Sequence, residues 1–392
     1  MTYTNAEKLV KTAHQNDSAD NLRKLLNALG SPERRFGIIK IFGESGKSSV
    51  TSMVSALLNG AGYRVGRLTT PVIGSIPDSL CVYEKSSPIK LFLDCAEKVY
   101  RAIVEIRKGS EEDADFSPSR NDLLYAIAFI FFAAVDCDVA VIEIPTENSS
   151  HTCFSSTALS VITSVHSEVT ARRICARLDR NGKEIVSSMQ EREIHKLISN
   201  KCAEINSRLT MPLRNSFVPM VSAIKHSEFS YGGRTYCVGC GAGFQIENLL
   251  TVLEASEALK RCGFKIAGTD ICQAVLSKGI PLCFETVAVM PTVIVDRADT
   301  KERRCALIES LKALKENISR SPFIISECDK EEISSEFLAE GFEPTVSECD
   351  LKALKKTLRE HKAKLDTEST LLILGNTEFC ESGAKLIREI LM

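Results

Sequence analysis

The fold of the chain is set by the stretch Phe36-Gly-Ile-Ile-Lys-Ile-Phe-Gly-Glu-Ser-Gly-Lys-Ser-Ser49. An apolar run rich in β-branched residues leads into a glycine turn, and a helix-forming pattern begins directly after the turn. This order is typical of a phosphate-binding loop, in which backbone N–H groups and a lysine hold an anion. Lys47 would supply the positive charge, and the hydroxyl of Ser48 or Ser49 would bind Mg²⁺. The stretch therefore predicts that the chain binds a nucleoside triphosphate.

Two features of this loop differ from the commonest pattern. That pattern has four residues between its first glycine and the Gly-Lys pair, whereas only Glu44 and Ser45 separate Gly43 from Gly46. The second feature is the carboxylate of Glu44, because a carboxylate beside an anion is unfavourable unless it points away or meets a cation. The alternative is a chance Gly-Lys-Ser in a surface turn, but the strand before the loop and the helix after it favour a phosphate site.

The composition limits the class of protein. The chain has 392 residues, of which 44% are hydrophobic and 26% charged, and its formal net charge is -2. This size allows two domains, and the weak charge predicts neither nucleic-acid binding nor attachment to a membrane. The first residues lack a secretory signal, so the 15 cysteines are expected to be reduced thiols in the cytoplasm. Cys237 and Cys240 have metal-ligand spacing, but no second pair follows, which favours ordinary thiols over a zinc site.

The alternation of apolar strands and amphipathic helices predicts an α/β fold. The predicted helices are 5–30, 48–58, 90–107, 120–134, 245–262, 301–315 and a last helix that runs to 391. The predicted strands are 37–42, 63–69, 138–144, 158–164, strands within 287–295, 323–326 and 370–374. Helices and strands are expected to alternate to about residue 235. We expect a P-loop ATPase domain with a parallel sheet at 1–285, followed by a smaller Rossmann-like α/β domain at 286–392.

Polar side chains follow several of the predicted strands. Lys47 and Ser48 follow the first strand and Thr70 follows the second. Glu143 ends the third strand, and His166 comes just after the fourth. Because the carboxyl ends of parallel strands meet in one crevice, these residues are expected to converge beside the phosphate loop. Glu143 would then be an Mg²⁺ ligand, although a solvated carboxylate at the start of a loop is the alternative.

Three motifs in the first part of the chain resemble those of one enzyme family. They are Leu25-Leu-Asn-Ala-Leu-Gly-Ser-Pro32, Gly43-Glu-Ser-Gly-Lys-Ser-Ser49 and Gly60-Ala-Gly-Tyr-Arg-Val-Gly-Arg-Leu-Thr-Thr-Pro71. Together they resemble the folylpolyglutamate synthase/dihydrofolate synthase family, a branch of the Mur ligase superfamily whose P-loop has the same short spacing. Weaker similarity continues in the family's order through Ala126–Phe129, Asp138–Glu143, Val161–Val165, Gln245–Asn248 and Val293–Asp296.

The resemblance implies a chemical reaction and a set of partners. In this family ATP phosphorylates a substrate carboxylate to an acyl phosphate, and an amino group, usually that of glutamate, displaces the phosphate to form an amide. The implied cofactors are ATP and Mg²⁺, and the implied substrates are a folate-type carboxylate of one-carbon metabolism and glutamate. A monomer that binds small molecules, and neither nucleic acid nor membrane, is expected.

The resemblance also implies roles for individual residues. Lys47, Glu143 and His166 would be catalytic. The remaining roles concern ligand binding: Gly43, Gly46, Lys47, Ser48 and Ser49 at the phosphates; Asn248 at the adenine; Asp296 at the ribose; and Ser48, Ser49, Thr70, Glu143 and His166 at metal, with His166 serving a second metal ion.

Several positions depart from the family pattern. The P-loop has Glu44-Ser45 in place of Thr-Asn, and the glycine-rich stretch after Glu143 is Ile144-Pro-Thr-Glu-Asn-Ser149. Arg177 and Lys183 stand in the region where the family carbamylates a lysine. Such changes leave two alternatives beside a folylpolyglutamate-type ligase. One is a nucleotide-binding paralogue without ligase activity, and the other is a Mur-type ligase for a different carboxylate.

Overall fold

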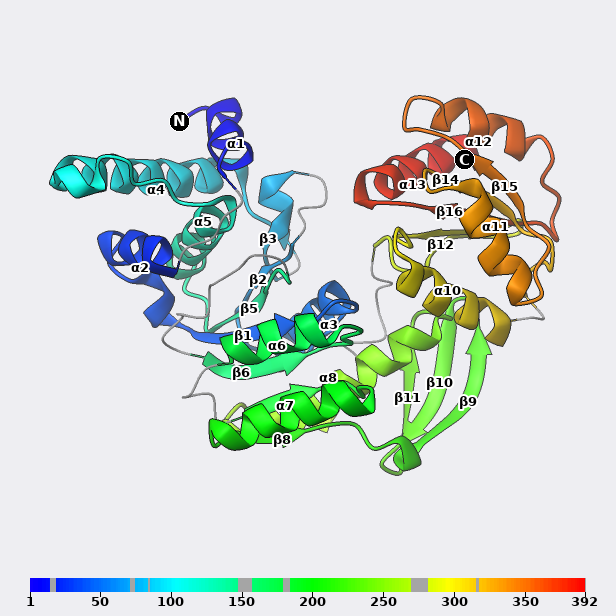
Figure 1. Ribbon diagram of the computed structural model, residues 1–392, viewed down its shortest axis with the longest axis horizontal. Helices are drawn as coiled ribbons and strands as arrows, with labels where there is room; N and C mark the ends of the chain where they lie inside the picture. Colours follow the sequence, from blue (N-terminus) through cyan, green and yellow to red (C-terminus); the bar gives the residue numbers. More distant parts are fainter. Residues whose placement is uncertain are drawn as a thin grey trace. The chain divides into compact units, whose positions relative to one another are not determined.

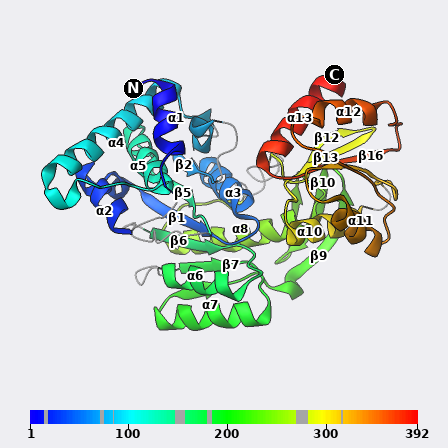
Figure 2. The same cartoon turned by 45° about the horizontal axis from the view of Figure 1, so that its top comes forward.

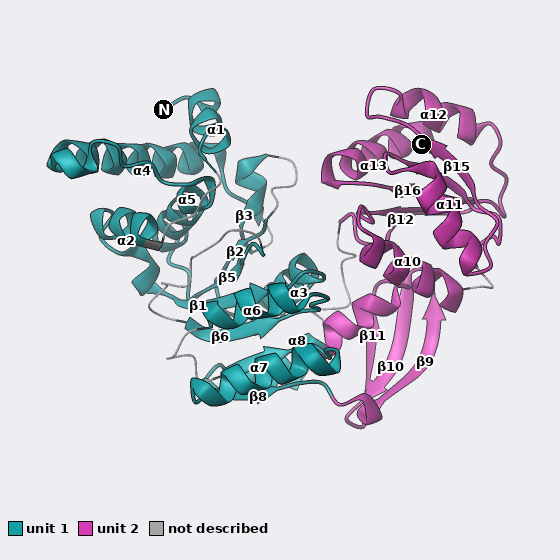
Figure 3. Cartoon of the chain, viewed as in Figure 1, with its two compact units in different colours: residues 1–212, 251–274 teal, residues 213–250, 275–392 magenta. Residues whose placement is uncertain are grey.

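The computed structural model describes residues 1–14, 19–70, 75–83, 85–146, 157–178, 184–268, 281–314 and 317–391. Pro71, Lys183 and residues 147–149, named above, lie outside the described residues. The chain forms two compact units, shown in teal and magenta in Figure 3. The larger unit comprises Met1–Pro212 and Thr251–Ala274, and the smaller unit comprises Leu213–Leu250 and Val275–Met392.

The larger unit is built on one sheet with strand order β4-β3-β2-β5-β1-β6-β7-β8. The six strands from β2 to β8 in this order are parallel, and β3 and β4 extend the sheet antiparallel at one edge. The strands are β1 (Gly37–Phe42), β2 (Val65–Leu68), β3 (Leu80–Val82), β4 (Lys85–Ser86), β5 (Val139–Glu143), β6 (Thr157–Ile162), β7 (Glu184–Ser187) and β8 (Arg208–Thr210). The strand predicted at 138–144 is β5, which lies between β2 and β1 and has all its residues buried.

Helices of the larger unit cover both faces of this sheet. They are α1 (Tyr3–Lys11), α2 (Ala19–Ala28), α3 (Lys47–Gly60), α4 (Ile89–Gly109), α5 (Arg120–Ala134), α6 (Glu168–Arg177) and α7 (Arg192–Glu204), and α8 (Gly243–Arg261) runs from the smaller unit into the larger one. Short 3₁₀ helices occur at Pro32–Arg35, Ile76–Ser79 and Glu111–Asp113. Figures 1 and 2 show α4 beside α5 and α6 beside α7, and each of these pairs is in contact.

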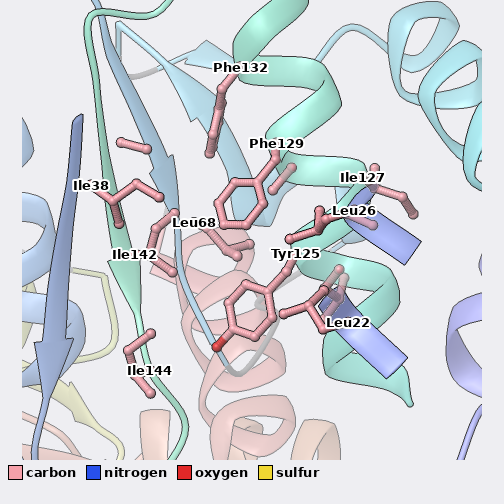
Figure 4. Close-up of a cluster of buried hydrophobic side chains, with 14 of the residues drawn as sticks. Leu22, Leu26, Ile38, Leu68, Tyr125, Ile127, Phe129, Phe132, Ile142 and Ile144 are labelled. Atoms are coloured by element: carbon pink, nitrogen blue, oxygen red, sulfur yellow. The ribbon is translucent and has the colours of Figure 1, made fainter. Parts of the chain in front are cut away.

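The main hydrophobic core lies between the sheet and the helices of one face. Tyr125 and Phe129 of α5 point toward the strands that carry Ile38 and Ile142 (Figure 4). Side chains alternate along a strand, so the next residue after Ile38 faces the opposite side, where α3 contacts β1, β2 and β5. Burial on both faces explains why the central strands are mainly apolar. Lys40 within β1 and Ser160 within β6 are buried polar residues that depart from this pattern.

The smaller unit contains two sheets. The strands β9 (Phe217–Ala223), β10 (His226–Tyr231) and β11 (Arg234–Val238) form an antiparallel sheet. The second sheet has the order β12-β13-β16-β14-β15, in which β12 is antiparallel to β13 and the others are parallel. Its strands are β12 (Glu285–Val289), β13 (Thr292–Asp296), β14 (Phe323–Ser326), β15 (Thr345–Glu348) and β16 (Thr370–Leu374), and its helices are α10 (Lys301–Ala313), α11 (Lys330–Ala339), α12 (Leu354–Lys362) and α13 (Thr377–Leu391). A 3₁₀ helix at Arg214–Ser216 precedes β9.

The predicted α/β class, with a parallel sheet in each unit, is confirmed, but two local predictions are wrong. The single helix expected at 5–30 is two helices, because α1 ends at Lys11, the described residues 12–14 are not helical, and α2 begins at Ala19. Residues 217–238 do not alternate helix with strand but form the β9–β11 sheet. Gly232 and Gly233 have φ of 57° and 77°, which suits the two-residue turn that joins β10 to β11.

The compact units do not divide the chain at the predicted boundary of 285/286. Residues 213–250 belong to the smaller unit, where β9–β11 lie. Gly241 packs closely against the backbone of Ala223 and the side chain of Leu314, which ties the β9–β11 segment to the C-terminal part of the chain. The boundary between independently folding domains remains a prediction. Among the described residues, no helix is both long and apolar enough to cross a bilayer.

Candidate phosphate and metal site

The P-loop, defined here as Gly43–Ser49, connects β1 to α3 and is shaped by its two glycines. Gly43 has φ of 135° and Gly46 has φ of 86°, values that side-chain-bearing residues rarely adopt. A Cβ on Gly43 would lie 2.0 Å from Thr163 Oγ1, so there is no room for any side chain. Gly46 is the N-cap of α3, and the glycines therefore set the angle at which the strand turns into the helix.

The first half of the P-loop is fastened to the segment that follows β6. The N–H groups of Glu44 and Ser45 both donate to Ser164 O, at 2.9 and 3.1 Å. Gln190 supports the same segment, because its Nε2 donates to Thr163 O at 2.9 Å and its Oε1 accepts from Val165 N at 3.1 Å. Two of the loop's N–H groups are used in this way, so a bound anion would be expected at the N-terminal turn of α3, where a helix carries partial positive charge.

Lys47 lies at the start of α3 with its ammonium group over the loop. Its Nζ donates to Gly43 O at 2.7 Å and to Thr146 Oγ1 at 3.0 Å. Thr146 Oγ1 in turn donates to Gly43 O at 2.8 Å. These two hydrogen bonds hold the positive charge of Lys47 at the loop.

Glu143 brings the predicted metal-binding groups together at the end of β5. Its side chain is only 1% exposed. Ser48 Oγ lies 3.2 and 3.1 Å from its two carboxylate oxygens, and Thr70 N donates to Oε2 at 3.2 Å. Ser49 is buried, at 3% exposed. The structure therefore places Ser48, Thr70 and Glu143 in one cluster beside the P-loop, with Thr70 engaged through its backbone N–H.

His166 and Glu44 form a second contact across the P-loop. The N–H of His166 donates to Glu44 Oε2 at 2.6 Å, and His166 Nε2 lies 3.3 Å from Ser45 Oγ. The Glu44 carboxylate is therefore bonded to the segment after β6. His166 does reach the loop, as predicted, through contacts with Glu44 and Ser45.

Asn248 and Asp296, the residues expected at the nucleoside, lie in the smaller unit. Asn248 is a buried residue of α8, and its Nδ2 donates to Gln245 Oε1 at 3.2 Å. Asp296 ends β13, is 6% exposed, and accepts a hydrogen bond from Phe284 N at 2.6 Å. Burial raises the pKa of Asp296 to about 7, against the lowering effect of the Phe284 hydrogen bond. Their contacts with a nucleotide remain predictions.

Thr146 and Gln190 were not predicted as site residues. Thr146 stands three positions after Glu143, in a stretch noted only as a departure from the family pattern. A hydroxyl soon after a buried strand that ends in a carboxylate was the available signal. Gln190 gave no signal in the sequence, because its role depends on the pairing of β6 with β7. No group of three or more His, Cys, Asp or Glu side chains among the described residues could hold a metal ion by itself, and all the described cysteines are free thiols.

Comparisons with known proteins find relatives named folylpolyglutamate synthase or dihydrofolate synthase. No protein-family model matches it. The chain is 22% identical to a folylpolyglutamate synthase of Lacticaseibacillus casei over 307 residues, which cover 74% of this chain and 71% of that protein. It is 31% identical to a dihydrofolate synthase/folylpolyglutamate synthase of Mycobacterium tuberculosis over 130 residues, 32% of this chain and 27% of that protein.

Solved structures of two folylpolyglutamate synthases have the same fold as this chain over nearly its whole length. The folylpolyglutamate synthetase of Lactobacillus casei superposes with a TM-score of 0.82 at 18% identity and full coverage of both chains. The folylpolyglutamate synthase of Mycobacterium tuberculosis superposes with a TM-score of 0.80 at 18% identity, covering 98% of this chain and 99% of that one. The fold is therefore the same, and the sequence match to the Lacticaseibacillus relative extends over most of the chain. The chain is therefore similar in sequence and in fold to folylpolyglutamate synthases and dihydrofolate synthases, at low sequence identity.

Proposed function

We propose that the protein is an ATP-dependent ligase that joins a folate-type carboxylate to glutamate through an acyl phosphate. The observation that carries this proposal is the cluster of Ser48, Thr70 and Glu143 beside the Lys47 ammonium group at the P-loop. A relative of similar fold has been solved in complex with AMPPCP and folate, and another with ADP and AMPPCP. A phosphate-binding helix start with a buried carboxylate at its side is what transfer of a phosphoryl group to a carboxylate requires.

The residues of the P-loop would bind and orient ATP. Gly43 and Gly46 let the backbone approach the phosphates, and Lys47 would neutralise charge on the transferring phosphoryl group. The substrate carboxylate oxygen attacks the γ-phosphorus, and ADP leaves. The glutamate nitrogen then attacks the acyl carbon, phosphate leaves, and the nitrogen loses a proton. In the smaller unit, Asn248 and Asp296 would contact the adenine and the ribose.

The donor set around Glu143 fits Mg²⁺, which prefers oxygen ligands. Glu143 and Ser48 would hold the ion, and the Thr70 N–H would keep the carboxylate in position. Ser49 and the side chains of Thr70 and His166 remain predicted ligands. Bound Mg²⁺ would stabilise negative charge on the phosphate oxygens. Because Glu143 is buried, its carboxylate is held in one place before the ion arrives, which favours a defined metal geometry.

A second candidate function is nucleotide binding without ligation. It is favoured by the contacts of His166, whose ring lies against Ser45 and whose N–H is bonded to Glu44. If the contact with Ser45 persists with nucleotide bound, the Nε2 atom of His166 is not available to a second metal ion. The P-loop and the Glu143 cluster would still support binding of Mg·ATP.

One experiment tests both candidates. Purified protein is mixed with Mg·ATP, glutamate and a reduced folate, and ADP release and product mass are measured. The ligase predicts ADP and a mass gain of one glutamate residue only when all components are present. Lys47→Ala should abolish both signals, whereas Lys24→Ala, which removes an exposed lysine of α2 paired with Asp113, should leave them unchanged. Nucleotide binding without product would support the second candidate.

A monomeric state, a cytoplasmic location and the absence of nucleic-acid and membrane partners remain predictions from composition and resemblance. Size-exclusion chromatography with light scattering would test the first of them directly. The mass of the chain is 43.1 kDa, so a monomer would elute with that value at all concentrations.

A further inference from the structure

Three hydrogen bonds connect the ammonium group of Lys47, the carbonyl of Gly43 and the hydroxyl of Thr146. Lys47 Nζ donates to Gly43 O and to Thr146 Oγ1, and Thr146 Oγ1 donates to Gly43 O, at 2.7, 3.0 and 2.8 Å. The threonine hydroxyl therefore acts as acceptor and donor at once. A lysine side chain has many rotamers, and each additional fixed acceptor narrows the positions that its charge can take.

The backbone next to Thr146 is fixed by a contact with α6. Arg177 Nη1 donates a hydrogen bond to the carbonyl of Pro145, the residue before Thr146, at 3.0 Å. Arg177 is 9% exposed and belongs to the last turn of α6. Proline restricts the backbone at position 145, so the position of the Thr146 hydroxyl depends on α6 as well as on β5. The contact to Lys47 thus links the P-loop to elements distant in the sequence.

We propose that Thr146 is a positioning residue that holds the Lys47 ammonium group where the phosphates of a bound nucleotide would lie. This inference rests on the proposed function of the P-loop. With the hydroxyl present, much of the conformational entropy of the Lys47 side chain is lost before the nucleotide binds, so less is lost on binding. Without the Thr146 hydroxyl, Lys47 Nζ loses one hydrogen-bond acceptor at the loop and samples more positions.

The test compares Thr146→Val with Thr146→Ser. Valine has nearly the shape of threonine but neither donates nor accepts, whereas serine retains the hydroxyl. Binding of AMPPCP with Mg²⁺ is measured by calorimetry in both variants, in Lys47→Ala and in the double variant. We expect Thr146→Val to weaken binding about tenfold, as for loss of one hydrogen bond to a charged group, and Thr146→Ser to restore affinity to within about twofold of the wild type.

The double variant separates positioning from a general effect on the fold. If Thr146 acts through Lys47, then Thr146→Val has no further effect once Lys47 is alanine. An equal loss of affinity in both backgrounds would overturn the inference, as would unchanged affinity in Thr146→Val alone.

A second measurement does not depend on nucleotide binding. The rate at which an amine reagent labels Lys47 in the ligand-free protein is followed by peptide mass spectrometry, with Lys24 as internal reference. We expect faster labelling of Lys47 in Thr146→Val, at an unchanged rate for Lys24. If the wild type fails to bind AMPPCP, the proposed function is wrong, and equal labelling rates of Lys47 would then overturn the positioning role separately.

Discussion

The replacement of Glu143 by glutamine separates a metal-binding role of this side chain from its role in the fold. Glutamine has the same size and keeps an oxygen that can accept from Ser48 and from the Thr70 N–H, but it carries no charge. We expect the variant to fold and to bind nucleotide through the start of α3. The additional stabilisation that Mg²⁺ gives to the nucleotide complex should be lost, because the buried carboxylate supplies the negative charge that attracts the ion.

The size of the effect follows from linkage between binding and folding. A ligand at 100 times its dissociation constant stabilises the folded state by about 2.7 kcal/mol. In domains of this size, each kcal/mol raises the melting temperature by about 2–4 °C. If loss of the Mg²⁺ contact weakens nucleotide binding tenfold, about 1.4 kcal/mol is lost, which corresponds to about 3–6 °C. Any change in the ligand-free stability cancels, because the measured quantity is the shift on adding Mg²⁺ at fixed nucleotide.

Thermal unfolding is followed with AMPPCP in the presence of Mg²⁺ and in the presence of a chelator. Glu33→Gln is the matched control, because Glu33 is also a buried glutamate of the larger unit, 5% exposed, and belongs to the 3₁₀ helix before β1. The control should keep the full Mg²⁺-dependent shift. A Glu143→Gln variant whose Mg²⁺-dependent shift equals that of the wild type would show that Glu143 is not a metal ligand.

Two further changes test the P-loop and the smaller unit. Gly43→Ala puts a Cβ 2.0 Å from Thr163 Oγ1 at a strained φ, so AMPPCP affinity should fall at least about tenfold. The control is Gly109→Ala, where a Cβ meets no atom within 4 Å, and it should leave the affinity unchanged. Equal AMPPCP affinities of the Gly43→Ala variant and the wild type would contradict phosphate binding at the P-loop. For Asp296, burial raises the pKa to about 7 in the folded protein, so the folded state holds a proton that the unfolded state has lost between about pH 4 and 7. The unfolding free energy of the smaller unit should therefore fall as pH rises through this range, and Asp296→Asn should remove that fall. Urea unfolding at pH 5 and pH 8 measures the unfolding free energy. The same pH dependence in the wild type and in Asp296→Asn would refute a raised pKa of Asp296.

The parts of the site that could be predicted are those encoded locally. The strand, the glycine turn and the helix start lie within Phe36–Ser49, and short-range sequence preferences fix each of them. The meeting of Ser48, Thr70 and Glu143 required one further rule, that the carboxyl ends of parallel strands share an edge. That rule needs only the order of strands and helices, so it held although several strand ends were misplaced by a residue or more.

The contacts that could not be predicted depend on strand pairing and on loops. Thr146 bonds to Lys47 across 99 positions of sequence, and nothing in the residues around Thr146 indicates which way its hydroxyl points. The β9–β11 sheet was missed for a different reason. Gly232-Gly233 between two short runs is a hairpin signal, but the flanking strands carry mixed polar residues and so lack a clear apolar alternation.

Glu44 shows how two separate sequence observations can concern one contact. From the sequence alone, the Glu44 carboxylate could point away from the phosphates or meet a cation. His166 was predicted separately, as a metal ligand. In the structure the carboxylate is bonded to the His166 N–H, and the His166 ring lies against Ser45, the next residue of the P-loop. The altered loop and the histidine after β6 are therefore complementary parts of one junction. Replacing Glu44-Ser45 alone by the Thr-Asn of the family would leave His166 without these partners, so the effect of the loop sequence on metal binding can be judged only when His166 is varied with it.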